Sequence, residues 1–137
     1  LPWEDYFMNI AREVATRSTC DRKHVGAVIV REKTILSTGY NGSIKGLPHC
    51  DEAGCEMVDG HCVRTSHAEA NAILKVASST QSCKGSTLYL TLSPCRECSK
   101  LIHQAGIIRL VYSKEYKDRT GIDFLKNAGV IVEQISL

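Results

Sequence analysis

The spacing of apolar residues along the first 40 positions predicts one helix followed by a β-hairpin. Apolar side chains recur at helical spacing from Trp3 to Arg17, which is typical of an amphipathic helix. Residues 26–30 have the character of a buried strand, and 34–40 are its expected partner, with Glu32-Lys33 at the hairpin tip.

The second half of the chain predicts helices and strands in alternation. We expect helices over 67–77, 94–104 and 120–127, and strands over 87–92, 107–112 and 130–135. Ser93 is the expected N-cap of the middle helix, with Pro94 at its first position, and Gly106 and Gly129 are the expected helix stops.

Alternation of this kind predicts parallel strands joined by crossover helices, beside the antiparallel hairpin. The expected fold class is therefore α/β, a three-layer α/β/α sandwich around a mixed central sheet of about five strands. At 137 residues the chain has the length of one such domain, residues 1–137.

The segment from Ser43 to Thr65 shows no regular apolar spacing, and a loop of this length is unusual inside a domain. It is rich in cysteine and histidine, which are residue types that bind metals, and a bound metal would offset the entropy lost when the segment becomes ordered. The chain has seven cysteines, and in a reducing compartment this density favours metal binding or catalysis over disulfides.

Charge and hydropathy argue against two kinds of partner. The formal net charge is +2, so there is no strongly basic surface for a nucleic-acid polymer. The longest apolar run, 25–30, is far shorter than the roughly 20 residues that span a bilayer, and the first residues do not resemble a secretion signal. We expect a cytoplasmic protein that binds neither a membrane nor a nucleic-acid polymer.

Two short segments combine metal ligands with an acid. His67 and Glu69 open one predicted helix, and Cys95 and Cys98 open another. Cysteines three residues apart share a helix face, and the positive end of the helix dipole stabilises their thiolates. With His67 they supply three ligands, and a zinc site with three protein ligands keeps its fourth position for water. The pattern predicts a catalytic zinc site.

Glu69 follows His67 by two residues, a rotation of about 200° on an ideal helix, which does not suit a shared ligand role. It is placed instead to move protons between water and a substrate. A lone Cys-x-x-Cys could also be half of a structural zinc knuckle or a redox pair. A structural site normally has a fourth protein ligand, and a redox pair has no need of His-x-Glu. The combined pattern is the signature of zinc nucleobase deaminases.

At these residues the sequence resembles the cytidine deaminase superfamily, and within it the viral and bacterial deoxycytidylate (dCMP) deaminases. The resemblance runs from Cys20 to Val132 and is carried by segments 20–30, 37–42, 64–73 and 88–98. It implies hydrolysis of dCMP to dUMP, with dCTP as an alternative or additional substrate, to supply thymidylate precursors. Some relatives are homohexamers that dCTP with Mg²⁺ activates and dTTP inhibits.

The resemblance also implies substrate contacts. Asn41 corresponds to an asparagine that bonds the sugar hydroxyl, although an Asn-Gly turn selected for its backbone is an equal interpretation. Residues expected to line the base pocket are Val25, Ala68, Thr91, Ser93 and Pro94, with Tyr112 and Tyr116 stacking near it. Tyr112 could instead simply cap a strand.

A nucleotide substrate needs cations for its phosphate. The candidates are Arg22, Lys114, Lys117 and Arg119. The two arginines rank first because a guanidinium binds phosphate through two parallel hydrogen bonds.

A second, structural zinc is implied for the Cys-rich segment. Its expected ligands are Cys20, Cys50, Cys55 and Cys62, and His49 or His61 could replace one of them. Reduced cysteines without metal are the alternative, since free cysteine often serves as a small apolar residue.

Two other functions fit parts of the pattern. One is deamination of another base, such as guanine or tRNA adenosine, and the other is a noncatalytic, zinc-stabilised binding module, for instance an accessory to DNA uptake. The low net charge and the Gly-Tyr-Asn-Gly turn argue against a tRNA reader. Glu69 argues against a noncatalytic module, which has no use for a proton shuttle.

Overall fold

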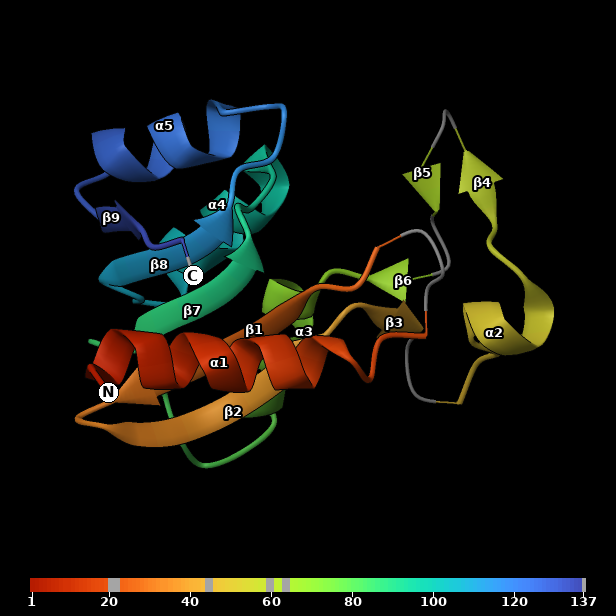
Figure 1. Ribbon diagram of the computed structural model, residues 1–137, viewed down its shortest axis with the longest axis horizontal. Coiled ribbons are helices and arrows are strands. Elements are labelled where there is room, and N and C mark those ends of the chain that lie inside the picture. The colour runs from red at the N-terminus through yellow and green to blue at the C-terminus, as the bar shows by residue number, and fades with distance from the viewer. Residues whose placement is uncertain (20–22, 44–45, 59–60, 63–64, 137) are drawn as a thin grey trace.

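A mixed five-stranded sheet forms the centre of the molecule (Figure 1). The computed structural model describes residues 1–19, 23–43, 46–58, 61–62 and 65–136, without the side chains of 43, 61, 62 and 65. The strands lie in the order β2-β1-β7-β8-β9. Their bounds are β1 Gly26–Arg31, β2 Thr34–Tyr40, β7 Thr87–Leu92, β8 Arg109–Lys114 and β9 Ile131–Gln134.

The sheet combines the two pairing patterns that the sequence predicts. β1 pairs antiparallel with β2 and with β7, whereas β7, β8 and β9 are parallel neighbours. Glu32 and Lys33 have φ angles of 51° and 61°, the left-handed backbone that a two-residue hairpin turn requires. The expected hairpin tip is therefore confirmed.

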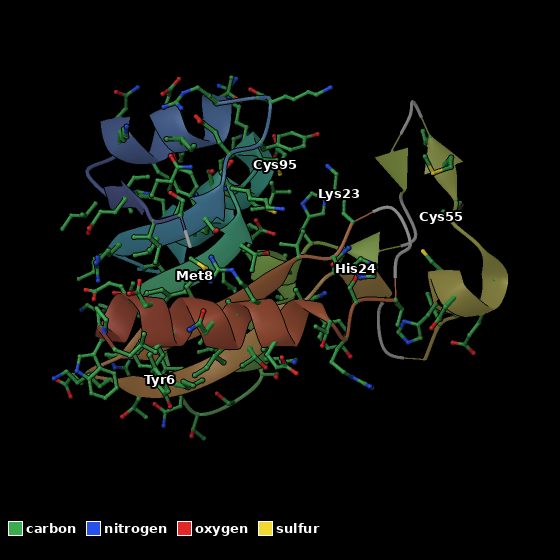
Figure 2. All side chains as sticks on the ribbon, in the orientation of Figure 1. Tyr6, Met8, Lys23, His24, Cys55 and Cys95 are labelled. Carbon is green, nitrogen blue, oxygen red and sulfur yellow. The ribbon has the colours of Figure 1, made fainter. Side chains whose placement is uncertain are left out.

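Helices cover both faces of the sheet, because alternate strand residues point to opposite sides. α1 (Trp3–Ala15) covers one face, where Phe7 and Met8 pack against Val28 and Val111. Figure 2 shows Met8 between α1 and the sheet. The other face packs against α3 (Ala68–Ala77), α4 (Arg96–Gln104) and α5 (Thr120–Asn127). The three-layer α/β/α architecture is confirmed.

The ends of α4 and α5 follow the glycine stops expected from the sequence. Gly106 has a φ angle of 92°, and the amide of Ile107 donates to the carbonyl of Ile102 at 3.3 Å. This bond is the helix-end closure that a glycine in the left-handed region allows. The Ile107 amide is therefore bonded to α4 and not to a neighbouring strand. β8 begins at Arg109, two residues later than predicted.

The predicted start of the middle helix is wrong. α4 begins at Arg96, and Cys95, not Ser93, is its N-cap, with its Sγ accepting a bond from the Cys98 amide at 3.4 Å. Ser93 is a good capping residue by type, but its hydroxyl instead accepts a bond from the Tyr116 amide at 2.7 Å. A contact across the fold therefore overrides the local preference.

The segment after β2 is not the featureless loop that the sequence predicts. It holds β3 (Gly42–Ser43), α2 (Cys50–Ala53), β4 (Met57–Val58), β5 (His61–Cys62) and β6 (Thr65–Ser66). These elements have only two to four residues, too few to show an apolar period. α2, β4 and β5 form a Cys-rich lobe that stands apart from the sheet (Figure 1).

Among the helices that the structure describes, none combines the length and the apolar character needed to cross a membrane.

Gly39 sets the distance between β2 and α3. A Cβ atom on it would lie 2.4 Å from the carbonyl oxygen of Ala68 and 2.6 Å from the amide nitrogen of Ala72. Gly39→Ala should lower the free energy of unfolding by about 1–3 kcal/mol, because overpacking forces the helix away from the sheet. Urea unfolding followed by circular dichroism measures the loss.

Gly42→Ala is the matched control, since the nearest atom to its added Cβ is 3.5 Å away, an ordinary contact. We expect Gly42→Ala to unfold at or above the wild-type urea concentration. Equal stability of Gly39→Ala and the wild type would contradict the close packing of β2 on α3.

Candidate metal and catalytic site

The N-termini of α3 and α4 lie side by side and bring three metal-binding side chains together. His67 is the N-cap of α3, Cys95 is the N-cap of α4, and α3 packs against α4. The ligand atoms of His67, Cys95 and Cys98 all lie within 4.8 Å of one another. The His67 Nδ1 atom is 3.2 Å from the Cys98 Sγ atom and 3.7 Å from the Cys95 Sγ atom.

These distances suit zinc. In a tetrahedral site with Zn–N and Zn–S bonds of about 2.0 and 2.3 Å, a nitrogen and a sulfur ligand lie about 3.5 Å apart. The two observed separations fall on either side of that value. One imidazole and two thiols are also the donor set that binds zinc in catalytic sites of this kind. The group therefore fits Zn²⁺ with three protein ligands.

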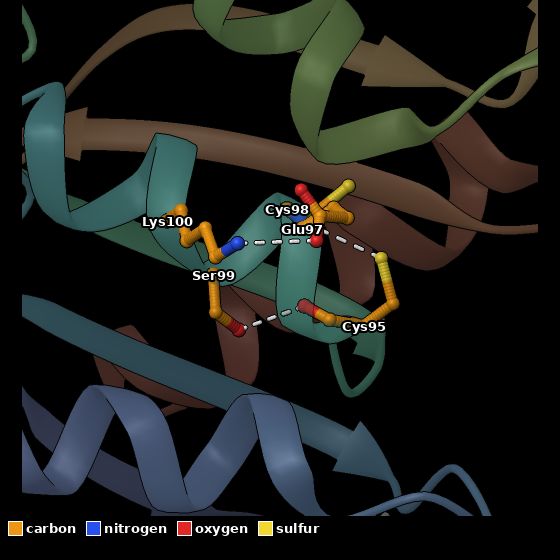
Figure 3. Close-up of polar contacts among 5 residues, drawn as sticks. All are labelled: Cys95, Glu97, Cys98, Ser99 and Lys100. Carbon is orange, nitrogen blue, oxygen red and sulfur yellow. Dashed lines mark hydrogen bonds and ion pairs between the residues drawn. The ribbon is translucent and has the colours of Figure 1, made fainter.

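The first turn of α4 holds Cys95 from two sides (Figure 3). The Cys98 amide donates to the Cys95 Sγ atom, and the Ser99 hydroxyl donates to the Cys95 carbonyl at 2.9 Å. The neighbouring Glu97 and Lys100 form an exposed ion pair at 3.2 Å and take no part in this contact. Cys95 is thus fixed by the helix start that follows it.

The cluster favours a negative charge on Cys95. The hydrogen bond from the Cys98 thiol lowers the pKa of Cys95 to about 4, and the same bond raises the pKa of Cys98. The hydrogen bond with Cys95 raises the pKa of His67, while the positive charge of the nearby Lys23 acts in the opposite direction. A thiolate at this position attracts a cation, since the thiolate is the form of cysteine that binds metal.

Glu69 lies buried next to the cluster, in the first turn of α3. Burial raises the pKa of Glu69 to about 7, and a hydrogen bond with Cys98 partly opposes this shift. A carboxyl group with a pKa near neutrality can both accept and donate a proton at the working pH of most enzymes. The arrangement can therefore supply a proton carrier beside a metal site.

Asn41 is buried, and both ends of its amide group bond the backbone of the segment before β1. Its Oδ1 atom accepts from the Val25 amide at 2.8 Å, and its Nδ2 group donates to the Lys23 carbonyl at 2.7 Å. The geometry supports the interpretation of Asn41 as a backbone support. Each end of the amide can make one further bond, so contact with a sugar hydroxyl stays a prediction.

The residues expected around a base lie at the ends of β1 and β7 and, for Ala68, at the start of α3. The Thr91 hydroxyl accepts a bond from the Gly26 amide at 3.1 Å, which joins the two strands. Ala68, Ser93 and Pro94 are buried, and Val25 is half-buried against the core. Tyr112 lies in the core beneath the three-helix layer, whereas Tyr116 is half-buried on the loop after β8.

The candidate phosphate ligands differ in their surroundings. The Arg119 guanidinium pairs with the Glu115 carboxylate, so its charge is already compensated. Lys114 and Lys117 are exposed, and Arg22 lies outside the described residues. Lys23 was not among the expected phosphate ligands, but its positive charge acts on His67. Its position next to Arg22 in the sequence is the signal that could have indicated it.

The cysteines of the Cys-rich lobe belong to a different part of the molecule from Cys95, as the labelled Cys55 shows in Figure 2. Cys50 is buried and Cys55 is half-buried. The His49 Nδ1 atom lies 3.0 Å from the Thr19 hydroxyl. Cys20 lies outside the described residues, as do the side chains of His61 and Cys62.

Comparison with known proteins settles the family. Residues 1–114 match the sequence profile of the cytidine and deoxycytidylate deaminase zinc-binding region. The chain belongs to this deaminase family.

The chain is similar to members from several sources. It is 46% identical to ComE operon protein 2 of Bacillus subtilis, over all of this chain and 73% of that protein. It is 42% identical to the deoxycytidylate deaminase of Saccharomyces cerevisiae, over 98% of this chain but only 45% of the yeast protein.

Among solved structures, the dCMP deaminase of cyanophage S-TIM5, in complex with dCMP and dUMP, superposes with a TM-score of 0.89. The two chains are 40% identical, and the match covers 96% of each. This chain therefore has the fold of the deaminase family, as the resemblance implied.

We expect Cys98→Ala to lose one zinc ion per chain relative to the wild type, because two ligands do not hold the metal as three do. Elemental analysis of the purified proteins measures the zinc content. Cys83→Ala is the matched control, since Cys83 is equally buried but lies outside the cluster. Full zinc content in Cys98→Ala would show that the metal binds elsewhere.

Proposed function

We propose that this protein is a zinc-dependent dCMP deaminase, which converts dCMP and water to dUMP and ammonia. The observation that carries the proposal is the buried carboxyl group of Glu69 beside the His67, Cys95 and Cys98 cluster. A structural zinc site normally has four protein ligands, whereas this cluster has three and a buried acid beside them.

In this mechanism His67, Cys95 and Cys98 hold the metal and Glu69 moves the protons. A zinc ion held by these three residues would lower the pKa of water enough to supply a nucleophile at neutral pH. The water oxygen forms a bond to C4 of cytosine, while the Glu69 carboxylate accepts one proton of that water and delivers it to the ring nitrogen N3. Glu69 then accepts the second proton from the same oxygen and delivers it to the amine on C4, so that the bond from C4 to nitrogen breaks, the C4 carbonyl forms and ammonia leaves. Burial of Glu69 keeps its pKa near 7, so that both transfers are accessible.

The choice of dCMP as substrate rests on the relatives. The cyanophage protein, 40% identical over nearly the full chain, binds dCMP and dUMP, and the yeast relative is a deoxycytidylate deaminase. We propose Asn41 as a sugar contact and the ends of β1 and β7 as walls of the base pocket. dCTP is the second candidate substrate, because its base and sugar are the same.

Three further features are proposals on the same basis. A second zinc would stabilise the Cys-rich lobe, where Cys50 is buried and Cys55 is half-buried. A homohexamer, with dCTP–Mg²⁺ and dTTP as effectors, follows from the resemblance. Leu74 of α3 and Leu101 of α4 are exposed apolar side chains that contacts between subunits could cover. The cysteine content fits a cytoplasmic location.

Zinc-loaded wild-type protein should release ammonia from dCMP, and Glu69→Gln should reduce kcat by about 10²- to 10⁴-fold, the usual contribution of a positioned acid–base group. An ammonia-release assay with dCMP, dCTP, deoxycytidine, guanine and adenosine measures both effects. Glu97→Gln is the matched control, because Glu97 lies exposed near the cluster and pairs with Lys100.

Two outcomes would contradict the proposal at different levels. Turnover of guanine or adenosine, with none of any cytosine nucleotide, would overturn the substrate class. Undiminished turnover in Glu69→Gln with unchanged zinc content would overturn the role of Glu69 as the proton carrier, but not the substrate class.

The second zinc predicts two zinc ions per chain in the wild type. Cys50→Ala should retain one of them, since Cys50 lies in the lobe and not in the His67 cluster. Elemental analysis decides between these values, and one zinc in the wild type would remove the second site.

A further inference from the structure

Lys23 and Tyr116 are in contact although they come from opposite ends of the chain. The Lys23 ammonium lies over the Tyr116 ring, 4.2 Å from its centroid, which is a cation–π contact. Lys23 precedes β1, and Tyr116 follows β8. The contact therefore joins the two segments that adjoin the ends of these strands.

The backbones of both partners are held by hydrogen bonds to buried side chains. The Tyr116 amide donates to the hydroxyl of Ser93, two residues before Cys95. The Lys23 carbonyl accepts bonds from the Asn41 amide group at 2.7 Å and from the Ser18 hydroxyl at 3.2 Å. The backbone positions of both residues are thus set by buried polar groups of the fold.

The charge of Lys23 is available to a ligand. The ion pairs of the described residues do not include Lys23, whereas Arg119 is paired with Glu115. The charge acts on His67, so it lies near the cluster. Figure 2 shows the Lys23 side chain on the side of the molecule where Cys95 lies.

We propose that Lys23, positioned by the ring of Tyr116, binds the 5′-phosphate of the substrate and so selects a nucleotide over a nucleoside. The inference rests on the proposed deamination of a cytosine nucleotide. An ammonium group has three donors, and those that face away from the ring can bond phosphate oxygens. Tyr116 acts through Lys23 as a positioning residue, which differs from stacking on the base.

Lys23→Gln tests the inference through the difference between nucleotide and nucleoside. We expect the KM for dCMP to rise about 10- to 100-fold, as for loss of a charge-assisted hydrogen bond, with kcat nearly unchanged. The kcat/KM for deoxycytidine should stay at the wild-type value. Equilibrium titration with dUMP should show the same loss of affinity, and titration with deoxyuridine should show none.

Variants of the ring separate positioning from folding. Tyr116→Leu should raise the KM for dCMP in the same direction as Lys23→Gln, whereas Tyr116→Phe keeps the aromatic face and should behave as the wild type. Lys33→Gln is the matched control, because Lys33 makes a similar contact with Trp3, 5.0 Å from the ring centroid, at the hairpin tip. It should leave all these constants unchanged.

The results distinguish this inference from the proposed function. Equal losses of dUMP and deoxyuridine binding in Lys23→Gln, or no loss of either, would overturn the role of Lys23. Absence of cytosine nucleotide turnover by the wild type would overturn the proposed function, and the dUMP titration would still decide whether Lys23 binds phosphate.

Discussion

The convergence of two helix N-termini is the constraint on which the site depends. α3 and α4 begin side by side, and each begins with a metal-binding residue as its N-cap, His67 and Cys95. The N-terminus of a helix carries partial positive charge, so two of them placed together repel unless negative charge lies between them. The Cys95 thiolate supplies that charge, and its low pKa follows from the hydrogen bonds that converge on it. Cys95 therefore serves two purposes: it begins α4 as its N-cap, and its negative charge offsets the positive ends of the two helices.

Glu69 shows the cost of such a site. A buried carboxylate is unfavourable, and its raised pKa measures the penalty of removing it from water. Glu69 lies in the first turn of α3, and the helix packs closely on β2 at Gly39, where the Ala68 carbonyl adjoins the strand. The acid is then kept beside the cluster in a state from which a proton leaves or returns easily. Perturbed carboxyl groups of this kind concentrate at functional sites.

Three side chains that are expected at the substrate pocket bond backbone groups of distant segments. Asn41 holds the segment before β1, Ser93 holds the loop after β8, and Thr91 joins β7 to Gly26. Asn41 and Ser93 are buried, and buried polar groups must find hydrogen-bond partners, which here are main-chain atoms. Lys23 and Tyr116 meet because two of these bonds fix their backbones.

Local patterns in the sequence determined much of this protein. Apolar spacing predicted the five sheet strands and the four main helices, and Gly106 and Gly129 predicted two helix ends, because these features depend on neighbouring residues. The pattern of His67, Glu69, Cys95 and Cys98 indicated the metal chemistry, because both the type of ligand and its position at a helix start can be recognised within a few consecutive residues. Tertiary structure alone decided that Cys95 rather than Ser93 caps α4, because the Ser93 hydroxyl bonds an amide 23 residues away. It alone placed Lys23 over Tyr116, because contacts between segments far apart in sequence follow from strand order and packing, which no local period encodes.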